Sequence, residues 1–179
     1  KGAIVLVPEI ALTPQTVERF KGRFGETVAV LHSSLSEGER HDEWHRIHTG
    51  AARIAVGARS AVFAPVSNPG LIVVDEEHEP TYKQEEAPRY HARDVAVMRG
   101  RMEGCAVVLG SATPAFESYH NVAKAKYVLA SLPVRVDHRR MPTIRVVDMR
   151  TEGRSGGGRG VFSRELADLI RLRLERGEQ

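Results

Sequence analysis

The chain has 179 residues, of which 41% are hydrophobic and 27% charged, so it is long enough for one domain with a buried core and hardly long enough for two. Its single cysteine, Cys105, excludes a disulfide framework within the chain, and its formal net charge of +3 indicates by itself no class of partner. The sequence has no apolar run long enough to span a membrane and no signal-peptide pattern, so we expect a cytoplasmic protein without membrane contacts.

Short apolar segments alternate with helix-like stretches along the chain. Each apolar segment has the length and the β-branched content that are typical of a buried strand. We expect six strands, at residues 3–7, 28–31, 53–56, 71–74, 106–109 and 144–147. Strands that alternate with helices predict an α/β fold, in which helices flank a parallel sheet.

The segments between these strands carry helix-start signals. Thr13-Pro14 is typical of an N-cap followed by the first helical residue, and Thr113-Pro114 repeats this pattern. Ser36, with Glu39 three residues later, has the spacing of a capping box. Ser163 predicts the start of a last helix, which ends near residue 176.

The C-terminal part has a different composition. Residues 154–160 read Arg-Ser-Gly-Gly-Gly-Arg-Gly, which is typical of a flexible tether. We therefore expect a folded body over residues 1–150, a Gly-rich linker over 151–162 and a C-terminal helix over 163–179.

Polar residues follow each of the first five predicted strands, in the loops 8–15, 32–34, 57–60, 75–78 and 110–113. The carboxyl ends of parallel strands lie at one edge of a sheet, and ligands bind beyond that edge. Five polar loops at one edge therefore predict a functional site.

The run "GLIVVDEEH" (70–78) leads from a buried strand directly onto three carboxylates and an imidazole. Burying such groups unpaired is costly, so a cation is their expected partner. Asp75, at the strand end, is well placed to hold Mg²⁺ through water. Glu76 is placed to orient or deprotonate a water that attacks a phosphoryl group. The alternative is an acidic surface turn without a ligand.

Several motifs, in order along the chain, resemble those of a known enzyme family. The run "VVDEEH" (73–78) is similar to the Walker B motif of DEAH-type helicases of superfamily 2, and "LGSAT" (109–113) to their motif III. The stretches "VPEIALTPQ" and "VGARSAVFAP" resemble their motifs Ia and Ic. Together with "LHSSLSEGER", "YKQEEAPRYHARD" and "LGSATPAFES", they resemble the primosomal replication-restart helicases over residues 6 to about 150.

This resemblance implies both a fold and an activity. The implied fold is a RecA-like parallel sheet, with residues 1–150 forming part of the ATP-binding first lobe of a two-lobe motor. The implied activity is that of an ATP-dependent 3′–5′ DNA helicase, which acts in replication restart and primosome assembly on single-stranded and forked DNA. ATP and Mg²⁺ are the implied cofactors, with zinc bound outside this chain. Other primosome proteins and a single-stranded-DNA-binding protein are the implied partners.

The resemblance also implies roles for individual residues at the strand ends. Asp75 corresponds to the carboxylate that holds Mg²⁺, and Glu76 to the catalytic base. His78 corresponds to the residue that couples the nucleotide site to DNA, and Ser111 and Thr113 to the relay between the two. Thr113 is equally compatible with a structural role as a helix cap.

Contacts to DNA are expected mainly at phosphates, because a motor must move over any sequence. The strand-end residues that suit such contacts are Gln15, Ser33, Ser34, Arg59 and Ser60.

A second group of candidates lies in residues 80–93, where aromatic and basic side chains alternate, a composition that suits stacking on bases. Its members are Tyr82, Lys83, Arg89, Tyr90 and Arg93. The alternative is a surface loop held in place by two buried tyrosines.

No Gly-Lys dipeptide occurs in the sequence, so the phosphate-binding Walker A loop is not in this chain. We therefore expect an internal fragment of the first lobe that does not hydrolyse ATP by itself. Two other functions stay open: another superfamily 2 DNA translocase, or a module that binds DNA or a partner protein without hydrolysis.

Overall fold

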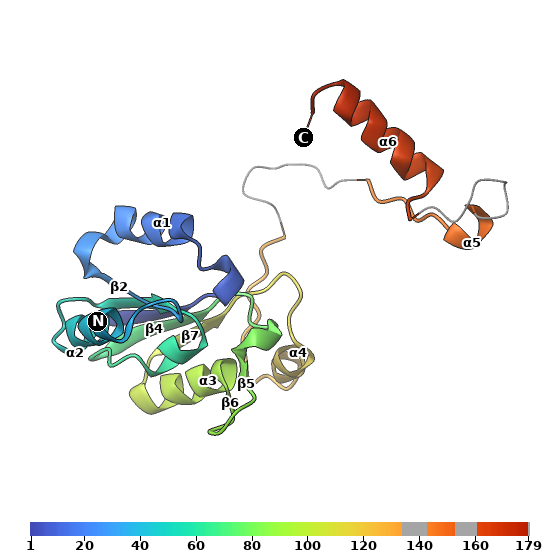
Figure 1. Cartoon of the computed structure of the whole chain (residues 1–179). Helices are drawn as coiled ribbons and strands as arrows, with labels where there is room; N and C mark the ends of the chain where they lie inside the picture. The colour runs from blue at the N-terminus through green and yellow to red at the C-terminus, as the bar shows by residue number, and fades with distance from the viewer. Residues whose placement is uncertain (134–142, 153–160, 179) are drawn as a thin grey trace. The chain divides into compact units, whose positions relative to one another are not determined.

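The computed structural model describes residues 1–133, 143–152 and 161–178. The chain divides into two compact units, Lys1–Leu129 and Ala130–Gln179. The first unit contains the sheet and the strand-end loops (Figure 1).

Five parallel strands form the sheet of the first unit, in the order β2-β3-β1-β4-β7. Their bounds are β1 (Gly2–Leu6), β2 (Val28–Leu31), β3 (Ile54–Gly57), β4 (Pro69–Val74) and β7 (Ala106–Leu109). Each overlaps a predicted strand. The predicted α/β fold with a parallel sheet is therefore confirmed.

The inner strands of the sheet are largely buried, which explains why they are continuous apolar runs, whereas the edge strand β7 leaves Val108 49% exposed. Ile4 and Leu6 of β1 belong to one core cluster, whereas Val5 packs with a second cluster. Successive side chains of a strand point to opposite faces, so β1, β2 and β3 supply both clusters, whereas β4 and β7 contribute to the first one.

Helices cover the two faces of the sheet, with α1 (Pro14–Phe24) on one side and α3 (Ala92–Glu103) on the other (Figure 1). Val17 and Phe20 of α1 pack against the cluster that contains Val5. Ala96 of α3 and Ile47 of α2 (Glu37–His48) belong to the cluster that contains Ile4.

The remaining elements of the first unit are short. They are η1 (Glu9–Ala11), η2 (Gly25–Thr27), η3 (Arg59–Phe63), η4 (Pro80–Tyr82), β5 (Lys83–Gln84), β6 (Tyr90–His91) and α4 (Phe116–Ala123). Strands β5 and β6 pair antiparallel and form a small second sheet.

In the first unit, two of the predicted helix starts are confirmed. The Thr13 hydroxyl accepts a hydrogen bond from the Thr16 amide at 3.3 Å, which caps α1. Ser36 and Glu39 form the complete capping box at the start of α2.

The prediction for Thr113-Pro114 is wrong, because α4 begins at Phe116 and its N-cap is Ala115. The Thr113 amide donates to the Ser111 hydroxyl at 3.0 Å, and the Ala115 amide donates to the Glu77 carboxylate at 2.7 Å. These bonds hold residues 111–115 in a loop, and the helix starts after it.

The sixth predicted strand, residues 144–147, is also wrong. Residues 143–148 form no regular secondary structure, and the side chains of Ile144 and Val146 are exposed. A strand is stabilised by a hydrogen-bonded neighbour and a buried face, and these residues have no ladder partner among the described strands.

The second unit contains α5 (Met149–Glu152) and α6 (Arg164–Glu175). Ser163 caps α6 by accepting from the Leu166 amide at 3.1 Å, so this helix start is confirmed. The Gly-rich tether at 154–160 lies outside the described residues. The division into a lobe over 1–150, a linker over 151–162 and a helix over 163–179 stays a prediction.

Candidate functional site

The carboxyl ends of the five strands lie in register at one edge of the sheet. Leu6 pairs with Gly57 on one side and with Val74 on the other, while Leu31 pairs with Gly57 and Leu109 with Val74. Backbone bonds extend the ladders into the loops: the amide of Asp75 donates to the Leu6 carbonyl, and that of Gly110 to the Val74 carbonyl, both at 2.9 Å. The loops after β4 and β7 therefore start side by side.

The acidic loop, residues 75–78, has an unusual backbone at its second residue. Glu76 has φ 46°, in the left-handed region that side chains other than glycine rarely adopt. The Asp75 carboxylate accepts from the Glu76 amide at 3.1 Å. Such strain persists only where the surroundings hold it in place, and it is concentrated at functional sites.

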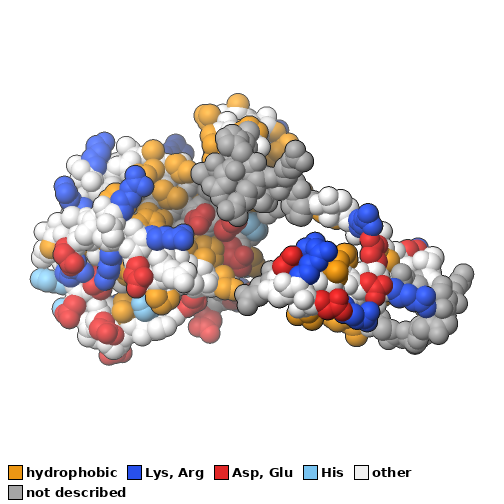
Figure 2. Space-filling model, turned by 90° about the horizontal axis from the view of Figure 1, so that it is seen from above, with side chains coloured by type: hydrophobic (Ala, Val, Ile, Leu, Met, Phe, Trp, Pro, Cys, Tyr) orange, Lys and Arg blue, Asp and Glu red, His pale blue; other side chains and the backbone are white. Residues whose placement is uncertain are grey.

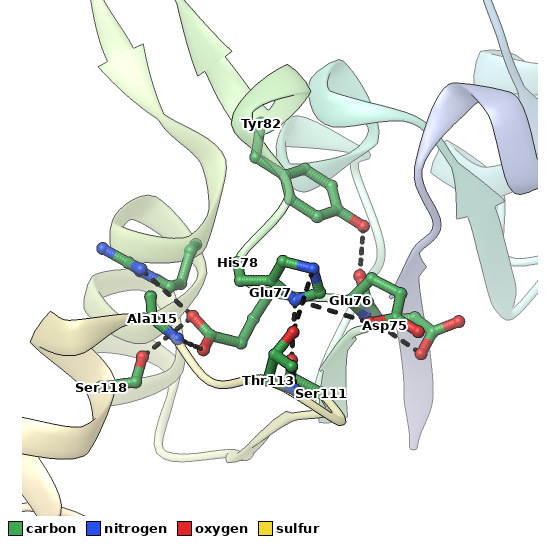
Figure 3. Close-up of polar contacts among 10 residues, drawn as sticks. Asp75, Glu76, Glu77, His78, Tyr82, Ser111, Thr113, Ala115 and Ser118 are labelled. Atoms are coloured by element: carbon green, nitrogen blue, oxygen red, sulfur yellow. Dashed lines mark hydrogen bonds and ion pairs between the residues drawn. The ribbon is translucent and has the colours of Figure 1, made fainter. Parts of the chain in front are cut away.

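Two further bonds hold the backbone on either side of Glu76. The Tyr82 hydroxyl donates to the Asp75 carbonyl at 2.7 Å (Figure 3). The Glu77 amide donates to the Gly110 carbonyl at 2.9 Å.

The imidazole of His78 joins the acidic loop to the loop after β7. Its Nδ1 lies 2.7 Å from the Ser111 hydroxyl and its Nε2 lies 3.5 Å from the Thr113 hydroxyl (Figure 3). The Nδ1 atom also lies 3.5 Å from the Glu76 carboxylate. The structure thus brings all five predicted catalytic residues together: Asp75, Glu76, His78, Ser111 and Thr113.

Asp75 is exposed beyond the end of β4, as a carboxylate that reaches a hydrated cation must be. The described residues contain no cluster of three or more His, Cys, Asp or Glu side chains that could enclose a metal ion. One carboxylate that acts through the water shell of Mg²⁺ fits this arrangement, because Mg²⁺ retains most of its waters.

Sequence reasoning missed Glu77, the third residue of the acidic loop. Its side chain is 1% exposed, and its carboxylate accepts from Arg93 at 3.1 Å, from Ser118 at 2.9 Å and from the amide of Ala115 at 2.7 Å. The only sign of this role in the sequence is that two glutamates, Glu76 and Glu77, follow one another. Their order does not reveal which of the two side chains is buried.

The prediction that Arg93 contacts DNA is wrong for this structure. Arg93 is buried, and its guanidinium pairs with Glu77 and Asp94 at 3.1 Å and with Glu117 at 3.7 Å. Burial opposes its charge, but the hydrogen bonds to Asp94 and Glu77 prevail and raise the pKa of Arg93 above its ordinary value. A guanidinium already paired in this way is not available to a phosphate.

Tyr82 is likewise not available for stacking, because its side chain is 1% exposed and belongs to the core. Burial raises the pKa of the Tyr82 hydroxyl, and the nearby charge of Asp75 adds to the increase. For this residue the alternative, a buried tyrosine, is the correct one.

Tyr90 is partly exposed and packs edge-on against Phe63, with ring centroids 5.1 Å apart. Both rings line a groove of about 670 Å³ between η3 and α3, together with Met98 and Met102. Tyr90 therefore keeps an accessible aromatic surface.

The other DNA-binding candidates lie mostly at the surface. Gln15, Ser33, Ser34, Ser60, Lys83 and Arg89 are exposed. The Ser33 hydroxyl donates to the Glu9 carboxylate. Arg59 instead donates to the carbonyls of Thr81 at 3.2 Å and Lys83 at 2.7 Å, so part of its guanidinium braces the segment that follows the acidic loop.

Residues 1–122 match the family model described as DEAD/DEAH box helicase. The chain therefore belongs to the DEAD/DEAH box helicase family, whose members generally use ATP and Mg²⁺.

The chain is also similar to curated proteins named replication restart protein PriA. It is 58% identical over 179 residues to that of Bacillus subtilis, 50% over 180 residues to that of Chlamydia pneumoniae and 41% over 179 residues to that of Haemophilus influenzae. These matches cover 100% of this chain and 22%, 24% and 24% of the relatives. The predicted resemblance to replication-restart helicases is confirmed, and the chain spans about a quarter of the length of these relatives.

Among solved structures, S. cerevisiae Dbp5 bound to RNA and ADP BeF3 matches 70% of this chain and 31% of that chain. The TM-score is 0.44 and the sequence identity is 15%. A likeness at this level carries no argument about function.

Proposed function

We propose that this chain forms part of the motor of an ATP-dependent 3′–5′ DNA helicase that acts in replication restart. The family and the relatives named PriA support this assignment. The observation that carries it is the contact of His78 with Ser111 and Thr113, because it joins the acidic loop to the neighbouring strand-end loop. A motor requires such a link between its nucleotide chemistry and its grip on DNA.

In this proposal, Asp75 holds Mg²⁺ through water, and the ion neutralises charge on the phosphates when ATP is bound. Glu76 orients the attacking water and accepts its proton. The left-handed backbone at Glu76 and the bonds on either side of it fix where this carboxylate lies. His78 holds Glu76 in a fixed relation to the loop after β7.

The proposed DNA contacts come from the exposed candidates. Hydroxyl and amide groups of Gln15, Ser33, Ser34 and Ser60 suit phosphate oxygens, whatever the base sequence.

Lys83 and Arg89 add positive charge in the segment that follows the acidic loop, and Tyr90 offers an aromatic surface there. We retain Arg59 as a partial phosphate contact.

The proposed setting is the bacterial cytoplasm, with single-stranded and forked DNA as substrate and with other primosome proteins and a single-stranded-DNA-binding protein as partners. Zinc is assigned to parts of the longer protein outside this chain. Among the residues that the structure describes, no helix is long and apolar enough to cross a bilayer.

The test uses a full-length protein that carries this chain. ATP turnover is measured with and without single-stranded DNA, and unwinding is measured on duplexes with a 3′ or a 5′ single-stranded tail. We expect DNA-stimulated turnover. We also expect unwinding of the duplex with a 3′ single-stranded tail in preference to the one with a 5′ tail, because a motor that moves 3′–5′ along the tail runs into the duplex only from a 3′ tail. DNA binding without any ATP turnover would instead establish the non-hydrolysing module.

A further inference from the structure

The carboxylate of Glu77 is buried, yet the chemistry proposed above makes no use of it. A charge that is 1% exposed must be paired, since an unpaired buried carboxylate is costly. Its oxygens accept from three donors: Oε2 from Arg93 and Ser118, and Oε1 from the amide of Ala115. Figure 3 shows this carboxylate turned away from Asp75 and toward Ala115 and Ser118.

The three donors come from two different parts of the fold. Arg93 is the second residue of α3, immediately after β6 and the segment that carries Lys83, Arg89 and Tyr90. Ala115 and Ser118 lie at the start of α4, immediately after the loop that carries Ser111 and Thr113. One carboxylate therefore joins the acidic loop to both segments.

This anchor bears directly on the residue before it. Glu76 is held at φ 46°, and the acidic loop is fixed on one side by the bond from Tyr82 to the Asp75 carbonyl. On the other side it is fixed by the amide and the carboxylate of Glu77. If the carboxylate is released, Glu76 can return to an unstrained φ, which displaces its side chain.

We propose that Glu77 is a positioning residue that holds Glu76 in place and ties it, through Arg93, to the segment of residues 79–91. The inference rests on the proposed function, and it adds a route by which contacts in that segment reach the catalytic carboxylate. Glu77 itself touches neither nucleotide nor DNA in this scheme.

The first test is Glu77→Gln in a full-length protein that carries this chain. Glutamine keeps the shape, but if its oxygen faces Ala115, its NH₂ group meets the donors of Arg93 and Ser118. Because small displacements of reacting groups are costly, we expect DNA-stimulated turnover to fall about tenfold or more. The KM for ATP should change by less than about threefold, because Glu77 contributes nothing to ground-state binding.

The matched control is Asp94→Asn. Asp94 is the other close partner of Arg93, at 3.1 Å, and its side chain is 66% exposed and outside the acidic loop. We expect turnover to stay at the wild-type level. Equal losses in the two variants would mean that Arg93 acts without Glu77, and would overturn the proposal.

A second variant, Ser118→Ala, removes one donor and keeps the ion pair. This variant replaces Glu77→Gln in the test if Glu77→Gln does not fold. We expect Ser118→Ala to lower turnover by less than Glu77→Gln does, at an unchanged KM for ATP. Wild-type turnover in folded Glu77→Gln, or in Ser118→Ala when Glu77→Gln does not fold, would overturn the proposal.

A measurement independent of activity uses amide chemical shifts of the 179-residue chain. Glu77→Gln, or Ser118→Ala in its place, should shift the amide signals of Glu76, His78, Ser111, Thr113 and Ala115, whereas Asp94→Asn should leave them in place. If the wild-type protein has no ATP turnover, the proposed function fails while these shifts still decide the positioning role. Unchanged amide signals at Glu76, Ser111, Thr113 and Ala115 would contradict the positioning role.

Discussion

Tyr82 stabilises the acidic loop from within the core. Its ring is buried among apolar side chains, and its hydroxyl reaches the carbonyl of Asp75 at 2.7 Å. A tyrosine in this position supplies both apolar packing and a hydrogen bond to a loop whose backbone is strained at Glu76. Tyr82 therefore holds the loop that carries Asp75 and Glu76, and it does not stack on a nucleobase.

Tyr82→Phe tests this role at the residue scale. The substitution keeps the ring and removes one hydrogen bond, so we expect the free energy of unfolding to fall by about 1 kcal/mol, measured by urea denaturation of the 179-residue chain. Tyr119→Phe is the control. Tyr119 is 64% exposed, so removal of its hydroxyl should leave the free energy of unfolding nearly unchanged. Equal effects of the two substitutions would contradict the assignment.

Side-chain caps determine where α1 and α2 start after the loops at the functional edge. After β2, the exposed residues Ser33 and Ser34 are followed by the capping box of Ser36 and Glu39, which starts α2. The Ser36 amide and hydroxyl both donate to the Glu39 carboxylate, at 2.9 and 2.8 Å. These bonds lower the pKa of Glu39.

Ser36→Ala tests the cap at the element scale. Loss of an N-cap side chain typically costs about 1 kcal/mol, so we expect the unfolding midpoint in urea to decrease while the m-value is unchanged. Ser34→Ala, two residues earlier and exposed, should leave the midpoint where it is. A lower midpoint in Ser34→Ala would show that this loop is structural, and would weaken its role in DNA binding.

Local patterns predicted the elements that depend on local chemistry. Apolar runs identified the five strands of the sheet, and the caps at Thr13, Ser36 and Ser163 identified three helix starts. The cap at Thr113 failed because Ser111 and Glu77 bind the backbone there, and Glu77 lies 38 residues before Ala115, the residue that it binds.

The same limit applies to the candidate site. The resemblance to a helicase family identified Asp75, Glu76 and His78, and the structure places them with the loop after β7. The resemblance does not distinguish exposed from buried residues within the aromatic and basic segment. It therefore predicts DNA contacts for Tyr82 and Arg93, although Tyr82 lies in the core and Arg93 pairs with Glu77. Burial depends on the three-dimensional neighbours of a residue, which the alternation of aromatic and basic residues does not reveal.

Charge over the first unit is mixed rather than segregated. Figure 2 shows Lys and Arg side chains interspersed with Asp and Glu over the visible face of this unit, and the whole chain has a formal net charge of only +3. A surface of this kind attracts a polyanion weakly and without regard to sequence.

We expect the 179-residue chain to bind single-stranded DNA weakly. We also expect it not to hydrolyse ATP, because it has no Gly-Lys dipeptide and therefore no Walker A loop to bind the phosphates. If Lys83 and Arg89 each neutralise one phosphate, the logarithm of the binding constant should fall with the logarithm of salt with a slope of about −1.4. The measurement is fluorescence anisotropy of a labelled oligonucleotide across a salt series, with ATP turnover assayed in parallel.

Lys83→Ala combined with Arg89→Ala should flatten that slope. Arg40→Ala combined with Arg101→Ala removes the same charge from exposed positions outside the candidate set and should change the slope less. Equal changes in both double variants would mean that binding depends on net charge alone.

The most direct measurement of the central claim is single-turnover ATP hydrolysis by a full-length protein carrying Glu76→Gln, with Glu85→Gln, an exposed carboxylate outside the acidic loop, as control. Removal of the base should slow hydrolysis by about 10²- to 10⁴-fold. ATP binding should persist, because the amide keeps the shape of the side chain. Hydrolysis at the wild-type rate in Glu76→Gln would contradict the account of this loop as the catalytic centre.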